Sequence, residues 1–143
     1  MGVAAGQRAS VSAVVADADT AISAGSGDVP VLATPRLLAL AEAAAVAAIE
    51  PQLPPGMTSV GTAASLEHRR ASPVGAEVVV EAELTEVDGR RLVFSFIARE
   101  VAGGGSAAGA AEDGEELVVG AGTVERVLVD RAAFLARAAS HRP

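Results

Sequence analysis

The chain has 143 residues, half of them hydrophobic and 20% charged, so it contains enough apolar material for one domain with its own core. Its formal net charge is -7, all eleven basic residues are Arg, and its only aromatic residues are three Phe. This composition argues against nucleic-acid binding, which needs a basic face and aromatic stacking platforms, but a few local arginines can still hold an anionic ligand.

The N-terminal third of the chain predicts a strand, a loop and one long helix. Residues 7–16 favour a strand, whereas residues 17–30 are small and polar, with Gly and Pro among them, and predict a loop. Thr34 followed by Pro35 is typical of a helix start, with Thr as the N-cap and Pro in the first turn. The prolines that follow Ile49 end this helix.

The rest of the chain predicts four more strands and a short C-terminal helix. Alternation of apolar and polar residues marks the strands, and Asp88 with Gly89 is a strong hairpin signal. Residues 101–115 are Gly-rich and then acidic, and they predict a mobile loop. The predicted strands are 58–70, 76–87, 90–100 and 117–129, and the predicted helix is 131–139.

This order of elements, a strand, a long helix and four strands in a meander, predicts an α+β protein. A long apolar helix beside an antiparallel sheet is hidden from water only if the sheet wraps around it, which describes the hotdog fold. We expect a single hotdog domain over residues 1–143. Because sheet edges and helix ends in such folds commonly pair with a second copy, we also expect a homodimer.

Residue types that bind metals or react as thiolates are scarce. The chain has no Cys and only two His, His68 and His141, so we expect neither a metal site nor a disulfide. The sequence shows no signal segment and no apolar run long enough to span a membrane. We therefore expect a cytoplasmic protein with no membrane partner.

Glu42 is the first candidate for chemistry, because it is the only ionisable residue in the helical stretch 37–49. A carboxylate among alanines is costly to bury unless it is paired, and a desolvated carboxylate suits a general base or a nucleophile. The sequence is equally consistent with Glu42 lying on the one wet face of the helix.

His68 is the second candidate. Strict alternation places it on the apolar face of its strand, in phase with Leu66, and places Gly61 on the opposite face. An inward His can orient a carboxylate or hold a proton, but a His at a strand end can also simply reach solvent. Gly61 inside a strand indicates either room for a ligand or, with no function implied, a bulge or tight packing against the Ala-rich helix.

Thr34 and three arginines complete the set of candidates. The N-cap position explains Thr34 by itself, although a hydroxyl at a helix start can also meet a ligand. Arg69, Arg70 and Arg126 are candidates for the phosphates of a nucleotide-like ligand, a role that few exposed arginines have.

Two spacings in the chain are similar to those of a known family. Thr34 precedes Glu42 by eight residues, and Gly61 precedes His68 by seven. The same similarity extends to the segments 71–75, 87–92, 122–126 and 130–135. From about residue 31 to residue 138, the chain resembles the fluoroacetyl-CoA thioesterase-like family of hotdog proteins.

This resemblance implies a dimeric hotdog enzyme that hydrolyses a small acyl-CoA thioester. Coenzyme A then enters as part of the substrate, and no metal or redox cofactor is needed. Residues 17–33 have no counterpart of the aromatic residue that gates the pocket of the fluoroacetyl-specific enzyme, so the acyl group stays open. The implied catalytic residues are Thr34, Glu42 and His68, and the candidate substrate-binding residues are Gly61, Arg126 and Arg69.

Two other functions remain open at this point. A hotdog module can bind acyl-CoA or an acyl carrier without catalysis, and a hotdog dehydratase acts on 3-hydroxyacyl thioesters with a His and a carboxylate at another spacing. The sequence also leaves open whether Glu42 attacks the thioester directly or activates water.

Overall fold

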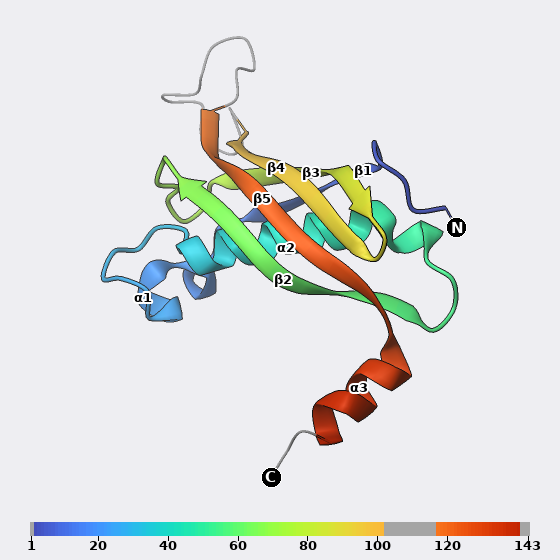
Figure 1. Cartoon of the computed structure of the whole chain (residues 1–143). Helices are drawn as coiled ribbons and strands as arrows, with labels where there is room; N and C mark the ends of the chain where they lie inside the picture. Colours follow the sequence, from blue (N-terminus) through green and yellow to red (C-terminus); the bar gives the residue numbers. More distant parts are fainter. Residues whose placement is uncertain (1, 102–116, 141–143) are drawn as a thin grey trace.

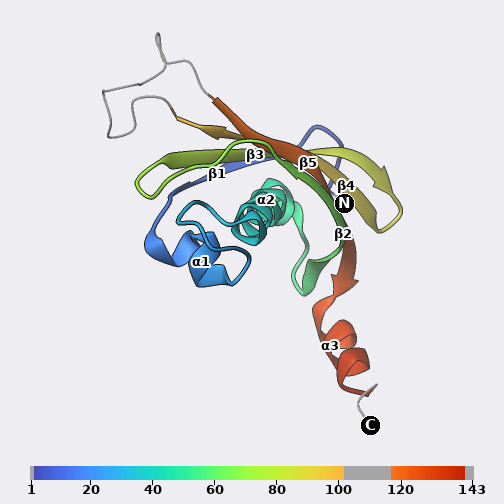
Figure 2. The same ribbon diagram turned by 90° about the vertical axis from the view of Figure 1, so that its left-hand side faces the viewer.

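The computed structural model describes residues 2–101 and 117–140, and it shows one antiparallel sheet curved around one long helix (Figures 1 and 2). The five strands lie in the order β1-β3-β4-β5-β2. The strands are β1 (Arg8–Val14), β2 (Met57–His68), β3 (Glu77–Asp88), β4 (Arg91–Glu100) and β5 (Leu117–Asp130). The helices are α1 (Ala21–Ala24), α2 (Thr34–Ile49) and α3 (Arg131–Ser140), with 3₁₀ turns η1 (Asp17–Asp19) and η2 (Glu50–Gln52).

The α+β class and the sheet wrapped around a helix are as predicted, but the strand order is not a simple meander. β3, β4 and β5 are neighbours in sequence and in space, whereas β2 pairs with β5, from Met57 opposite Asp130 to His68 opposite Gly120. In the predicted meander, β2 would pair with β3. The structure shows β1 in that position, so the meander prediction is wrong. β2 is therefore an edge strand with one unpaired side.

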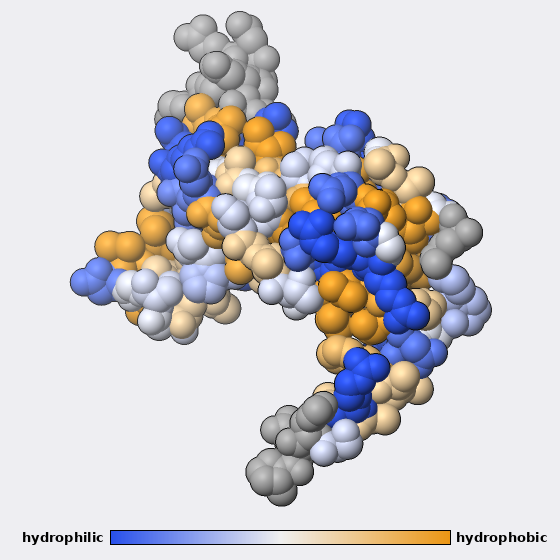
Figure 3. Space-filling model, in the orientation of Figure 1, coloured by the Kyte–Doolittle hydropathy of each residue, from blue (hydrophilic) through white to orange (hydrophobic). Residues whose placement is uncertain are grey.

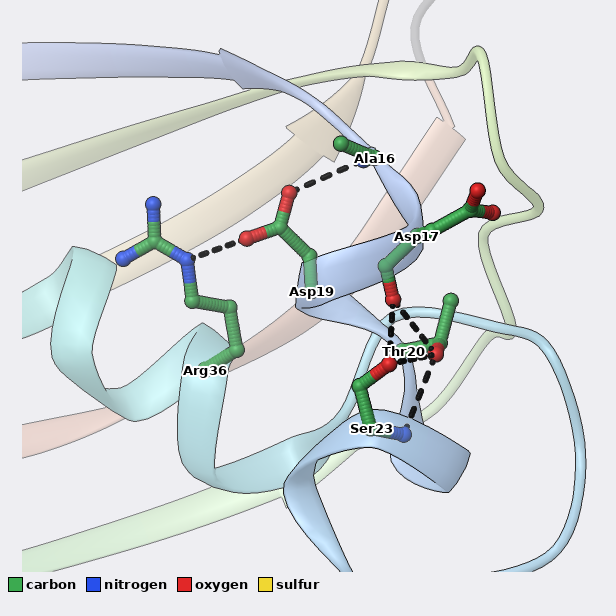
Figure 4. A network of polar contacts seen from close by, with 6 residues as sticks. All are labelled: Ala16, Asp17, Asp19, Thr20, Ser23 and Arg36. Carbon is green, nitrogen blue, oxygen red and sulfur yellow. Dashed lines mark hydrogen bonds and ion pairs between the residues drawn. The ribbon is translucent and has the colours of Figure 1, made fainter.

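The predicted loop 17–30 contains two short helical elements, so that prediction is wrong for part of the segment. The Thr20 hydroxyl accepts a hydrogen bond from the Ser23 N–H over 3.4 Å and caps α1 (Figure 4). Gly25 ends α1 in the left-handed conformation, with φ of 75°. Small polar residues and Gly are typical of loops, but they also supply the caps of a short helix. The predicted mobile loop lies, apart from Val101, outside the described residues.

Asp19 ties this N-terminal segment to the first turn of α2 (Figure 4). Its carboxylate accepts hydrogen bonds from the Ala16 N–H and from Arg36 Nε, each over 2.8 Å. The bond from Ala16, together with Arg36, holds the pKa of Asp19 below its ordinary value although partial burial opposes the shift. α1 and the residues after it are therefore held at the N-terminal end of α2.

Alanine residues allow α2 to lie close to the concave face of the sheet, where Phe94 and Leu84 are fully buried. Each large apolar side chain buried in this way stabilises the fold by roughly 1.5–3 kcal/mol. The buried residues of α2 are Leu37, Leu40, Ala41, Ala44, Ala45, Ala48 and Ile49.

The opposite face of the sheet is more polar. Hydrophilic residues gather over β4 and β5 with hydrophobic residues around them (Figure 3). Arg91 pairs there with Glu86 at 3.1 Å and with Glu125 at 2.9 Å. α3 projects from the end of β5 with no buried residue (Figure 1). None of the described helices has both the length and the apolar character that a membrane crossing requires.

Candidate active site

Thr34 begins α2 and contacts the end of β2. Its hydroxyl oxygen lies 2.8 Å from Nδ1 of His68. The prediction that Thr34 is the N-cap is wrong, because fully buried Ala33 holds that position with an extended backbone and the cap has no side-chain hydrogen bond. The Thr34 hydroxyl therefore pairs with His68, 34 residues further along the chain, and not with the backbone at the start of α2.

His68 is half-buried, and its second ring nitrogen has no partner. Nε2 is buried and forms no hydrogen bond within the described part of the chain. Burial lowers the pKa of His68, and a weak polar contact with the backbone of Arg70 opposes this only in part. A neutral imidazole can accept from Thr34 at Nδ1 and keep an N–H at Nε2 for another group. The ring is thus placed to exchange a proton.

Glu42 lies two turns further along α2, and a buried arginine holds it. Arg126 Nη1 is 3.2 Å from Glu42 Oε2, while its Nε and Nη2 donate to the side chain and backbone of Ser59 over 2.8 and 2.9 Å. The Arg126 side chain is 10% exposed, and burial lowers its pKa while the charge of Glu42 raises it. In this chain Arg126 therefore positions Glu42, which is 39% exposed.

Gly61 leaves the space that the Glu42 carboxylate occupies. A Cβ at this position would overlap Glu42 Oε2 and would also lie 3.3 Å from Arg126 Nη1. Of the two interpretations of this strand glycine, the structure of the single chain shows close packing, and the group that approaches the backbone is a carboxylate.

A β-bulge explains how Gly61 and His68 both face α2. Gly61 pairs with Arg126 and Ala63 pairs with Glu125, so Thr62 is an extra residue in β2. One extra residue reverses the alternation of side chains along the rest of a strand. The prediction from strict alternation that Gly61 and His68 lie on opposite faces is therefore wrong.

The single chain thus contains two separate groups of candidate residues, which we call half-sites. The first half-site is Thr34 with His68, and the second is Glu42 with Arg126 and Gly61. Eight residues of helix place Thr34 and Glu42 about 12 Å apart along the axis of α2. Throughout the described residues, no hydrogen bond joins the two half-sites.

A groove of about 320 Å³ lies beside the first half-site. Its lining includes Thr34 and His68, residues 26–29 before α2, and residues 69–71 after β2. Arg69, a predicted substrate-binding residue, is among them, but its guanidinium donates to Glu67 over 2.9 and 3.1 Å and is largely exposed. Within the ranges that the structure describes, no three His, Asp or Glu side chains are grouped as metal ligands.

Comparisons with known proteins connect these residues to an enzyme family. The family model described as fluoroacetyl-CoA-specific thioesterase matches residues 15–132. The fluoroacetyl-CoA thioesterase of Streptantibioticus cattleyicolor is 36% identical over 113 residues, which are 79% of this chain and 71% of that protein.

Solved structures agree with both the family and the fold. A structure of the fluoroacetyl-CoA thioesterase superposes with a TM-score of 0.80 at 31% identity and covers 100% of both chains. A hot-dog-like protein from Thermanaerovibrio acidaminovorans is 22% identical, with a TM-score of 0.79 over 97% of this chain and 93% of its own, and confirms the hotdog fold. This chain belongs to the fluoroacetyl-CoA-specific thioesterase family.

Proposed function

We propose that this chain hydrolyses the thioester of a small acyl-CoA to the free acid and coenzyme A, and that it does so as a homodimer. The observation that carries the proposal is the pair of half-sites on α2, one able to exchange a proton and one presenting a carboxylate. Family membership favours hydrolysis over the non-catalytic module and the dehydratase. A cytoplasmic location belongs to the same proposal but is not needed for its chemistry.

Two surfaces of the chain support the homodimer. β2 is an edge strand whose residues 61–65 are exposed, so its unpaired backbone groups can accept another strand. The outward side of α2 is apolar and incompletely buried, with Glu42 as its only charged group beyond the first turn. Its uncovered apolar residues are Leu38, Ala39, Ala43, Val46 and Ala47.

The spacing of the half-sites fits a two-fold axis through both surfaces. The midpoint between Thr34 and Glu42 is Leu38, and the midpoint between Gly61 and His68 falls between residues 64 and 65. If β2 pairs antiparallel with its copy about that point, His68 lies across from Gly61 of the partner subunit. The same symmetry brings Thr34 towards Glu42 of the partner subunit. Each dimer then contains two complete sites, each built from both chains.

The proposed reaction follows from this placement. The thioester carbonyl lies at the start of α2, where free backbone N–H groups stabilise the oxyanion, each such donor contributing about 3–4 kcal/mol. Glu42 of the partner subunit either takes a proton from the attacking water or attacks the carbonyl carbon itself, in which case water then hydrolyses the acyl anhydride and frees the carboxylate. The C–S bond breaks, and His68 relays to the departing thiolate a proton that comes from the water consumed in the reaction. Thr34 holds the His68 ring, and the chemistry needs no metal or redox cofactor.

Thiol release from a panel of short, branched and aromatic acyl-CoAs tests this function. The chain has no Cys and adds no background to a thiol reagent. We expect release from the wild type, none from Glu42→Gln or His68→Ala, and normal release from the control Glu50→Gln, which alters an exposed carboxylate just after α2. Binding without release from any acyl-CoA would sink the hydrolase proposal in favour of a binding module, and loss of water from a 3-hydroxyacyl-CoA would favour a dehydratase.

A further inference from the structure

Backbone contacts hold both walls of the groove beside Thr34 and His68. Val31, in the wall before α2, forms a bridge with Pro73 just beyond the wall that follows β2. The N–H groups of Arg69 and Arg70 both donate to the carbonyl of Val119, over 2.7 and 3.1 Å. The groove is therefore a fixed feature of the fold rather than a gap between loose side chains.

The charged side chains that line this groove are only partly paired. The Arg69 guanidinium is bonded to Glu67, but the Arg70 guanidinium forms no hydrogen bond or ion pair with any described residue. Asp28 lines the groove as well and likewise has no polar partner among the residues described. The groove thus contains one guanidinium and one carboxylate that have no side-chain partner among the described residues and form no ion pair with each other.

The size and position of the groove suit one end of a thioester substrate. Its volume of about 320 Å³ is at the lower end of small-molecule pockets, roughly 300–1,000 Å³. It begins at the two side chains that would meet the thioester, so whatever extends from the reacting carbon on this side enters it. An uncommitted guanidinium at that point is suited to carboxylate or phosphate, which it binds through two parallel hydrogen bonds.

We propose that this groove binds an anionic group of the thioester substrate, with Arg70 as the binding residue and Asp28 as the charge that limits its affinity. The inference rests on the proposed thioesterase function and adds the substrate class to it. The anion is either a carboxylate at the far end of the acyl group or a phosphate of coenzyme A. Both have the same chemistry at Arg70, and they differ in which part of the substrate carries the charge.

A comparison of succinyl-CoA with butyryl-CoA tests the proposal, because the two acyl groups have the same chain length and only the first ends in a carboxylate. KM and kcat are measured for the wild type, Arg70→Ala, Arg70→Lys and Asp28→Asn. The control is Arg90→Ala, which removes an exposed arginine outside the groove. We expect Arg70→Ala to raise KM about tenfold with little change in kcat, and Arg70→Lys to recover part of the loss.

The pattern across substrates identifies the anion. A rise in KM for succinyl-CoA alone assigns Arg70 to an acyl carboxylate, whereas equal rises for both substrates assign it to a phosphate. In the second case, Arg70→Ala has no effect on butyryl-pantetheine, which lacks the phosphates. Asp28→Asn is expected to lower KM about twofold for the same substrates, the opposite direction to Arg70→Ala. Unchanged KM values for Arg70→Ala on both substrates overturn the proposal.

Failure of the subsite is distinguishable from failure of the proposed reaction. If the wild type releases no thiol, the same comparison is made on dissociation constants for succinyl-CoA and butyryl-CoA by calorimetry. Weaker binding to Arg70→Ala than to Arg90→Ala then upholds the anion subsite in a protein that is not a thioesterase. Equal binding to both variants removes the subsite.

Discussion

The two half-sites on α2 are built in different ways. Thr34 and His68 form a pair of polar groups that border a groove, and Nε2 of His68 is left without a partner in the described chain. Glu42 is instead fixed by an arginine whose Nε, Nη1 and Nη2 are all engaged, and it lies against a glycine with no room for a side chain. One half-site is thus open for a substrate, and the other holds a carboxylate in one position.

This difference matches what each group has to do in hydrolysis. A proton carrier needs a free nitrogen and a pKa near the working pH, and burial shifts the pKa of His68 downwards. A base or nucleophile needs a defined position, since a displacement of about 1 Å can lower a rate by about 100-fold. Within the single chain the two groups of residues remain apart, and the proposed homodimer is what would bring them together.

A mixing experiment gives the largest expected effect. Glu42→Gln and His68→Ala are each expected to be inactive, but a mixed dimer of the two contains one site with both wild-type residues. After unfolding and refolding together, half of the dimers are mixed, so activity returns to about one quarter of the wild-type value. The measurement is thiol release by each variant alone and by the refolded mixture.

The opposite result has an equally clear meaning. If both half-sites came from one chain, every site in the mixed dimer would contain one defect, and the mixture would stay inactive. A mixture that forms dimers but releases no thiol therefore rejects the shared site.

Gly61→Ala is expected to give the next largest effect, and it alters only the half-site that contains Glu42. The added methyl group overlaps Glu42 Oε2, and the carboxylate is the flexible end of a side chain, so it moves rather than the backbone. We expect kcat to fall about 100-fold with a change in Tm of only a few degrees. The rate of thiol release and the thermal melting curve of the variant check this, and a wild-type kcat would show that the observed position of Glu42 is not required.

The elements of this fold were largely predictable because their signals are local. The prolines after Ile49 end α2, and a turn at Gly89 and Arg90, one residue later than the predicted hairpin signal, joins β3 to β4. The single charge within the otherwise apolar body of α2 also singled out Glu42. By contrast, the order of the sheet depends on β1 pairing with β3, a contact between segments about 70 residues apart that no local pattern encodes.

The residues of the candidate site could be selected from the sequence, but their arrangement in space could not. The bulge at Thr62 is invisible in an alternating sequence, yet it decides that Gly61 and His68 share a face. The local motif at Thr34 is typical of an N-cap, but in the fold its hydroxyl is hydrogen-bonded to His68 instead. Arg126 was identified as a charge that could meet a phosphate, and only the fold shows that Glu42 is its partner.

Arg126→Met gives a moderate effect and can be compared with a matched control on the polar face. Both Arg126 and Arg91 pair with carboxylates, but Arg126 is nearly buried and Arg91 is exposed. We expect Arg126→Met to lower stability by about 1–2 kcal/mol and kcat about tenfold, because Glu42 and the Ser59 groups lose their donor. Arg91→Met should change stability by about 0.5 kcal/mol or less. Urea unfolding checks both, and equal effects would remove the distinction between the two arginines.

The smallest expected effect is on the pH dependence of stability, and it comes from His68. Burial lowers the pKa of His68, so between that lowered value and about 6.5 the unfolded chain binds more protons than the folded one. The free energy of unfolding therefore falls as pH decreases through this window, and His68→Asn should remove that part of the slope. Urea unfolding at pH 7.5 and 5.5 measures it, and His141, present in both proteins, cancels in the difference. If the free energy of unfolding changes equally with pH in both proteins, the His68 ring is as well solvated in the folded protein as in the unfolded chain. Burial would then not be lowering its pKa.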